Sequence, residues 1–251
     1  MTAKAAKRMR IFFIFAVFLK KPTALPLVYT FAPMWLEIYR IFRLNWRLEW
    51  QKRRSYFSLL IYVLATAYLS YLLFKGQMSA ATWNGFFWVI FLFAAIQAAY
   101  RSFGYEAGSR YLLYAAWLKP EFLILGKILY NFLYLLFLGV LTALLLVFLL
   151  SQQIADPLAF VAVIFLAALG FSSVLTLTAG LSAKASQNPA LPAILSIPLL
   201  YPQLVVLSRI SLETLTGFSW ELNRPFLLVL SMIALVALLM AYLLFPYLWR
   251  D

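Results

Sequence analysis

Six long apolar runs constrain the fold of this chain more than any other feature. They cover residues 56–74, 83–100, 128–150, 158–181, 191–207 and 226–245. A helix needs about 20 apolar residues to cross the hydrocarbon of a membrane, and most of the runs reach that length, with the fifth borderline. With 65% hydrophobic and 12% charged residues, the chain is predicted to be an all-α membrane protein with six transmembrane helices.

The positions of lysine and arginine predict the orientation of these helices. Twelve precede the first run, four lie in 101–127, and two more follow on the same side, which makes 18. The opposite side has three, Lys75, Arg209 and Arg224. Basic loops stay in the cytoplasm, so we expect both termini there. The net charge of +13 then reflects topology and contact with anionic lipid, and we expect no nucleic acid partner.

Two segments precede the first run. Residues 1–33 contain an apolar stretch that is too short to span a membrane, with no small-residue cleavage site after Lys20 and Lys21. We expect a poorly ordered N-terminal extension over 1–33 and a transmembrane domain over 34–251.

Within 35–50, helical spacing predicts an amphipathic helix in the headgroup layer, with three arginines on its flank; a helix packed on a soluble partner is the alternative. Its apolar face contains Trp35, Ile38, Tyr39, Phe42 and Trp46.

The content of the apolar runs argues against several classes of function. None has a charged residue near its centre, whereas ion-coupled carriers and charged-ring channels need such groups. The chain lacks the GxxxxGK[ST], HExxH and GxSxG motifs, and it contains no Cys and no His. We therefore expect no catalytic residue, no metal site and no firmly bound cofactor. The energy for any transport must come from a partner.

The fourth and fifth runs have distinctive patterns. In the fourth, Ala168, Ser172, Thr176 and Gly180 recur every four residues, which predicts close helix packing; a polar substrate path that also uses Ser173 is the alternative. In the fifth, three prolines predict a kinked helix that is pressed against other helices rather than lipid. They are Pro192, Pro198 and Pro202. Residues 208–225 then suit a short helix at the outer interface.

The interval 101–127 is the most polar stretch between two runs. Its mixed pattern predicts a short helix along the cytoplasmic surface, and Pro120 suits the first turn of the next helix. Such a surface helix, joined to two spans, can transmit force from a soluble partner. An ordinary interfacial helix is the alternative reading of the same pattern.

Several of these features together resemble a known family. The order of an amphipathic helix, six spans, and an intervening segment with Glu106, Gly108, Gly126 and Lys127 resembles type-2 ABC exporter permeases. More narrowly, it is similar to the CcmB family of haem exporter subunits in bacterial cytochrome c maturation. The most characteristic stretches are WRLEWQKRRSYFSLLIYVLATAYLSYLLF, the 106–127 segment, and LGFSSVLTLTAGLSAKASQNPALPAILSIPLLYP over 169–202. The resemblance covers 34–251, although many relatives have several prolines after the Glu-Gly pair and only Pro120 remains here.

The resemblance implies a non-catalytic permease subunit of the bacterial inner membrane that couples ATP hydrolysis by a partner to haem export or to release of a haem-loaded chaperone. It implies a CcmA-like ATP-binding subunit, a CcmC-like haem-handling membrane protein and a second copy of the chain as partners, with haem as cargo. The alternatives are a permease for a lipid, glycan or drug, and a scaffold that assembles membrane complexes. The residues implied at the ATPase-coupling surface are Glu106, Gly108, Arg110, Tyr111, Tyr114, Lys119, Pro120 and Lys127.

Overall fold

The regular structure in the described part of the chain is entirely helical. The computed structural model describes residues 38, 39, 41–43, 46, 53–74, 78–104, 120–185, 191–217 and 219–250. These residues belong to one compact unit, Ile38–Asp251. The expected N-terminal extension over 1–33 and the expected surface helix within 101–127, apart from its two ends, lie outside the described residues.

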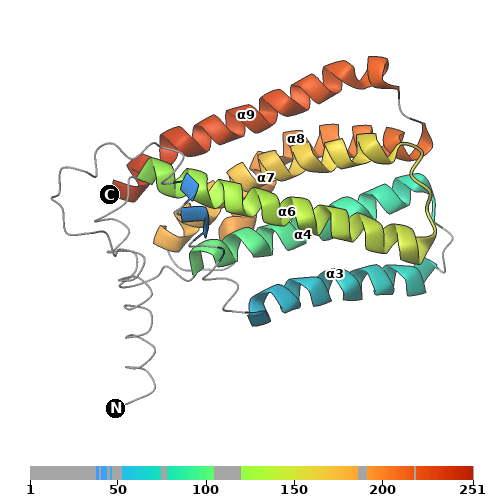
Figure 1. The fold of residues 1–251 in the computed structure, drawn as a ribbon, viewed down its shortest axis with the longest axis horizontal. Coiled ribbons are helices and arrows are strands. Elements are labelled where there is room, and N and C mark those ends of the chain that lie inside the picture. Colours follow the sequence, from blue (N-terminus) through green and yellow to red (C-terminus); the bar gives the residue numbers. More distant parts are fainter. Residues whose placement is uncertain are drawn as a thin grey trace, which may run out of the picture. The chain divides into compact units, whose positions relative to one another are not determined.

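Within the described ranges, six long helices follow one another, and they confirm the six predicted spans. They are α3 (Arg53–Phe74), α4 (Ala80–Gly104), α6 (Pro120–Leu150), α7 (Pro157–Ala185), α8 (Leu191–Thr216) and α9 (Trp220–Arg250). Each contains a stretch that is long and apolar enough to cross a membrane. Consecutive helices reverse direction (Figure 1), so the bundle has two ends. We call them the Pro120 end, where α6 begins, and the Asp156 end, which holds the turn before α7.

Local sequence features mark the start of α7 and the end of α8. The Asp156 carboxylate accepts a hydrogen bond of 3.0 Å from the Ala159 N–H, and Pro157 occupies the first turn of α7, where its missing N–H costs nothing. At the end of α8, Gly217 has a φ of 144°, a backbone conformation that favours glycine. The expected outer helix over 208–225 is therefore not separate: residues 208–216 continue α8, and α9 begins at Trp220.

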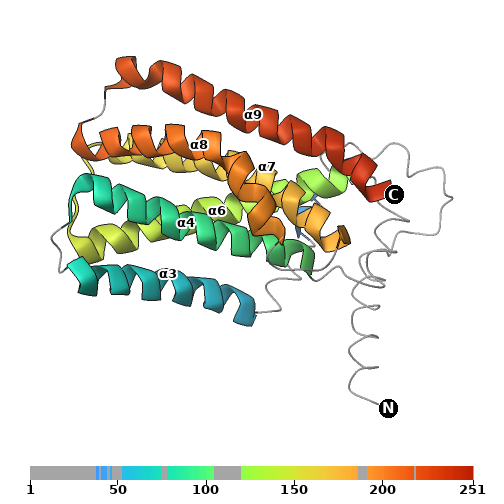
Figure 2. The same cartoon turned by 180° about the vertical axis from the view of Figure 1, so that it is seen from behind.

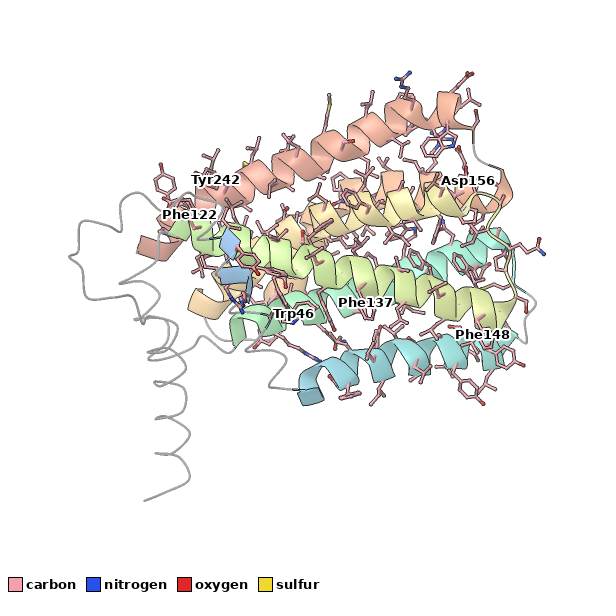
Figure 3. The ribbon with its side chains drawn as sticks, viewed as in Figure 1. Trp46, Phe122, Phe137, Phe148, Asp156 and Tyr242 are labelled. Atoms are coloured by element: carbon pink, nitrogen blue, oxygen red, sulfur yellow. The ribbon has the colours of Figure 1, made fainter. Side chains whose placement is uncertain are left out.

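Helix α7 forms the centre of the bundle. It packs against α4, α6, α8 and α9, and 61% of its membrane-spanning window is buried, compared with 22% for α3 and 17% for α9. Helices α3 and α9 lie at opposite edges (Figures 1 and 2). Apolar side chains project outward from the bundle (Figure 3), including Phe148 of α6, which is 82% exposed. Outer faces of this kind suit contact with lipid tails.

An aromatic ladder joins α4 to α7. Trp83, Phe87 and Phe91 recur every four residues of α4, and their ring planes stack with centroids 5.8 and 5.9 Å apart. Phe171 of α7 continues the stack, with its ring centroid 5.6 Å from that of Phe91. Gly139 allows α6 to approach the same place, since a Cβ there would lie 2.7 Å from Ile164 and 3.1 Å from Phe91. The core of the bundle therefore lies between α4, α6 and α7.

Helix α8 differs from what its prolines predict. Pro198 and Pro202 lie inside the helix, and α8 changes direction along its length (Figure 2), as expected for proline-containing helices. However, only 28% of its spanning window is buried, and both prolines are exposed. The expectation that this span is pressed against other helices is therefore wrong within this chain. One face of α8, which includes Pro192, packs inward, and the face that bears Pro198 and Pro202 is uncovered.

Candidate coupling end and polar core

The coupling surface expected from the sequence falls largely outside the described residues. Six of its eight members lie within 105–119, and their roles stay predictions. They are Glu106, Gly108, Arg110, Tyr111, Tyr114 and Lys119. Pro120 is buried and is the first residue of α6, which confirms the predicted helix start. Glu121 follows in the first turn, where a carboxylate interacts favourably with the helix dipole.

The described residues between 38 and 46, which we call the N-terminal segment, contact α6 at Gly126. A Cβ on Gly126 would lie 2.6 Å from Ile41 Cγ2 and 3.3 Å from the backbone oxygen of Ile38. One turn further along α6, the ring of Tyr130 lies 6.3 Å from that of Phe42. Ile41 is buried, although the sequence pattern did not assign it to the apolar face. The glycine of the Gly126-Lys127 pair is thus explained by close contact between two segments of the chain.

Lys127 lies in the interior at the Pro120 end. It is 0% exposed, it follows Gly126 directly, and it takes part in interactions within the chain. Burial of a charged ammonium costs several kcal/mol unless the group is paired and hydrogen-bonded. Lys127 therefore presents no surface to a docked subunit, and any part it has in coupling must act through the packing around α6. That role stays a prediction.

The predicted stripe of α7 lies inside the bundle. Ala168, Ser172, Ser173 and Thr176 are fully buried, whereas Gly180 is partly exposed. The hydroxyls of Ser172 and Ser173 both donate to the Leu169 carbonyl, at 2.9 and 3.0 Å. These two serines therefore satisfy their hydroxyls within their own helix, as serine commonly does in apolar surroundings.

Among the residues of this stripe, Thr176 makes a hydrogen bond to another helix. Its hydroxyl oxygen accepts from the side-chain amide of Asn131 in α6, at 2.8 Å, and both residues are buried. Side-chain hydrogen bonds between transmembrane helices contribute about 0.6 kcal/mol on average. The sequence pattern found Thr176 but missed Asn131, a lone amide in a long apolar run.

A second buried amide joins α7 to α8. Gln203 is 1% exposed, and its Nε2 donates to the Leu166 carbonyl at 3.3 Å. It lies against Gly170, where a Cβ would be only 2.2 Å from that nitrogen. Glycine at position 170 thus creates the space that the amide occupies. Sequence reasoning missed this pair, although a lone Gln directly after Pro202 in an apolar run is a usable signal.

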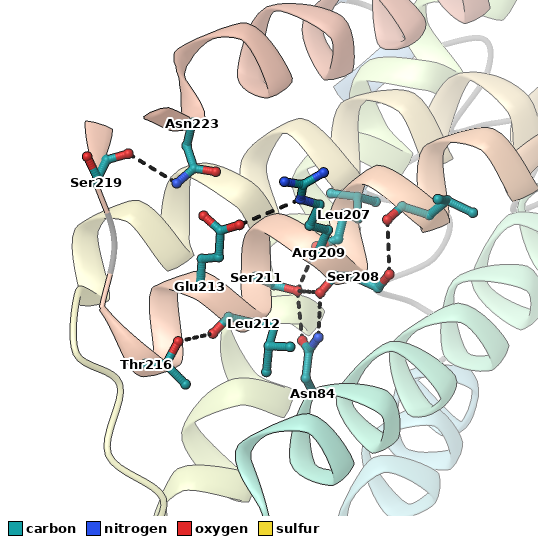
Figure 4. Close-up of polar contacts among 11 residues, drawn as sticks. Asn84, Leu207, Ser208, Arg209, Ser211, Leu212, Glu213, Thr216, Ser219 and Asn223 are labelled. Atoms are coloured by element: carbon teal, nitrogen blue, oxygen red, sulfur yellow. Dashed lines mark hydrogen bonds and ion pairs between the residues drawn. The ribbon is translucent and has the colours of Figure 1, made fainter. Parts of the chain in front are cut away.

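A polar cluster fastens α8 to α4 at the Asp156 end (Figure 4). The Ser211 hydroxyl lies 2.7 Å from Asn84 Oδ1 and accepts a 2.8 Å hydrogen bond from Trp88 Nε1. The Asn84 amide donates to the Ser208 carbonyl at 2.7 Å. Because all three side chains are buried and mutually paired, they hold the second half of α8 in place. The sequence pattern did not identify this cluster.

The rim outside this cluster is charged. Arg209 Nε lies 3.6 Å from a Glu213 carboxylate oxygen one turn along α8, and its guanidinium lies 4.2 Å from the centre of the Phe226 ring in α9. Exposed ion pairs of this kind contribute little to stability. Arg209 therefore links the ends of α8 and α9 chiefly by lying over the aromatic ring.

Comparison with known protein families decides the assignment. The family model for the CcmB protein matches residues 36–246. The chain belongs to the CcmB family. It is accordingly a membrane permease subunit of the haem exporter for cytochrome c maturation, and its six helices make it a multi-pass membrane protein. A comparison with curated proteins finds no match.

Proposed function

We propose that this chain is the non-catalytic subunit through which an ABC complex couples ATP hydrolysis to haem handling for cytochrome c biogenesis. A separate CcmA-like subunit hydrolyses ATP, a CcmC-like membrane protein handles haem, and two copies of this chain pair in the inner membrane. Hydrolysis drives release of the haem-loaded chaperone or export of haem. The CcmB match over residues 36–246 carries the proposal, because it covers five of the six helices completely and all but the last turn of α9.

The distribution of charge supports a cytoplasmic Pro120 end. Eighteen of the 21 basic residues fall on the side of 101–127 and both termini, and three fall on the other. The partner ATPase then docks where α4 ends and α6 begins, on the segment that joins them. With no Cys and no His in the chain, haem is cargo of the complex and not a resident cofactor of this subunit.

Co-purification tests this coupling surface. Arg110→Glu combined with Lys119→Glu is expected to release the ATPase subunit from the membrane subunit, because it reverses two charges on the joining segment. Lys75→Glu combined with Arg224→Glu makes the same change in charge on the opposite side, and the complex is expected to survive. Retention of the ATPase by the first variant would show that the segment is assigned wrongly. Failure of the wild-type chain to bind any ATPase would overturn the ABC proposal itself.

A further inference from the structure

The hydrogen bonds that fasten α8 to the rest of the bundle all lie in its second half. We call residues 191–202 the arm of α8 and residues 203–216 its base. Four residues of the base bond to α4, to α7 or to the turn before α7: Gln203, Ser208, Ser211 and Thr214. Among the described residues, none in the arm bonds to another helix. The base is therefore held by polar contacts (Figure 4), and the arm is held by packing alone.

The arm is also the less buried part of α8. Its buried residues are Pro192, Ser196 and Leu200, whereas six residues of the base are buried. The Ser196 hydroxyl donates to the Pro192 carbonyl, so it joins the arm to no other helix. In a membrane, apolar packing between helices competes with lipid tails that are equally apolar, so it resists displacement only weakly. The contacts of the arm thus leave it free to change its angle.

Two prolines lie where the arm meets the base. Pro198 and Pro202 have no N–H, so the carbonyls four residues earlier lose their helical donor. Prolines of this kind are a usual cause of sharp helix kinks, and α8 changes direction along its length (Figure 2). Both prolines are exposed, so the described residues do not enclose the bend. The helix is weakest at the place where its attachment to the bundle begins.

We propose that the arm of α8 pivots on the base about Pro198 and Pro202, and that this movement carries work from the Pro120 end into the bundle. Consecutive helices reverse direction (Figure 1), so the arm begins at the Pro120 end. At 1.5 Å per residue the arm is about 18 Å long, so a change of about 10° in the bend moves its far end by about 3 Å. The pivot follows from the contacts of α8, whereas its use in coupling rests on the proposed function, which places the ATPase at that end.

Distances between spin labels test the pivot. The chain contains no Cys, so pairs of introduced cysteines are labelled specifically. One label is placed at Ile61 of α3, and the other at Leu195 in the arm or at Val205 in the base, all of them exposed positions. The protein is reconstituted in nanodiscs with unlabelled copies in excess, so that only distances within one chain are measured. The distance distribution to Leu195 is expected to be wider than that to Val205 by roughly 3 Å. Equal widths would overturn the proposal.

Restoring the missing N–H groups tests the prolines as the cause. Pro198→Ala combined with Pro202→Ala is expected to fold, because both positions are exposed and alanine favours helix. The distribution to Leu195 should then narrow to the width found for Val205. Pro225→Ala combined with Pro246→Ala is the matched control, since it removes two prolines from α9, and it is expected to leave the width unchanged. An unchanged width in the α8 variant, or equal narrowing in the α9 variant, would overturn the pivot.

The same two variants test the use of the pivot in the full complex. The α8 variant is expected to retain the ATPase subunit and to lose most of the holocytochrome c in cells, whereas the α9 variant keeps it. Normal holocytochrome c in the α8 variant would overturn the role of the arm in coupling. Absence of the ATPase from the wild-type complex would overturn the proposed function instead, and the spin-label distances would still decide the pivot.

Discussion

At the scale of single residues, the bundle depends on places where a small side chain admits a buried amide. Gly170 and Gln203 illustrate this, because the space next to the glycine is occupied by the amide of the other helix. A methyl group at position 170 would displace a side chain that is only 1% exposed. The two residues therefore form a single packing unit between α7 and α8.

Gly170→Ala is expected to destabilise the protein by about 1–3 kcal/mol, as overpacking of a closed interior does. Titration with SDS in mixed micelles measures the effect as a shift of the unfolding midpoint. Gly85→Ala is the control, since a Cβ at position 85 has no atom within 4 Å and alanine favours helix. Adding Gln203→Ala to Gly170→Ala should recover part of the loss. Equal stability of the two single variants would contradict this packing.

The cluster at the Asp156 end gives a second prediction. Ser211→Ala removes the hydroxyl that pairs with Asn84 and Trp88, leaving two buried polar atoms unpaired at a cost of about 1–3 kcal/mol. Ser208→Ala is the matched control, because Asn84 bonds to the backbone carbonyl of that residue. The same SDS titration should separate the two variants. If both unfold alike, the cluster does not fasten α8 to α4.

At the scale of helices, Gly126 governs how the N-terminal segment meets α6. Gly126→Ala places a methyl group within 2.8 Å of two carbons of Ile41, a β-branched residue with little rotamer freedom in a helix. The variant is expected to detach the segment, so that a cysteine introduced at the partly buried Phe42, with Ile41 left in place, reacts faster with a maleimide than it does beside Gly126. Gly139→Ala, which crowds α6 elsewhere, should leave that rate unchanged. Equal labelling in all three proteins would refute the contact.

The helices themselves were predictable from the sequence, and their contacts were not. Apolar length is a local property, so all six spans could be found, and Pro120 correctly marked the start of α6. The partners of Asn131 and Ser211 lie 45 and 127 residues away in the chain, and one sequence does not reveal such pairs. The prolines of α8 correctly predicted a helix that changes direction, but the prediction that other helices cover this span was wrong, since Pro198 and Pro202 are exposed.

At the scale of the whole molecule, the chain is a six-helix membrane permease subunit, and we propose that a partner supplies its energy. Its buried polar contacts tie α4, α6, α7 and α8 together, its basic residues are predicted from the sequence to lie mostly on one side of the membrane, and the face of α8 that bears Pro198 and Pro202 is exposed. Each of these features fits a subunit that pairs with a copy of itself and receives work from an ATPase. Membership of the CcmB family connects this subunit to haem handling.

The level of holocytochrome c tests this account most directly. It is measured in cells that lack the chain, in cells with the chain restored, and in cells whose partner ATPase is inactivated in its nucleotide site. The account predicts that c-type cytochromes lose their haem in the first and third strains and regain it in the second. Normal holocytochrome c without the chain would contradict a role in haem handling, and normal holocytochrome c with the inactive ATPase would contradict coupling to ATP hydrolysis.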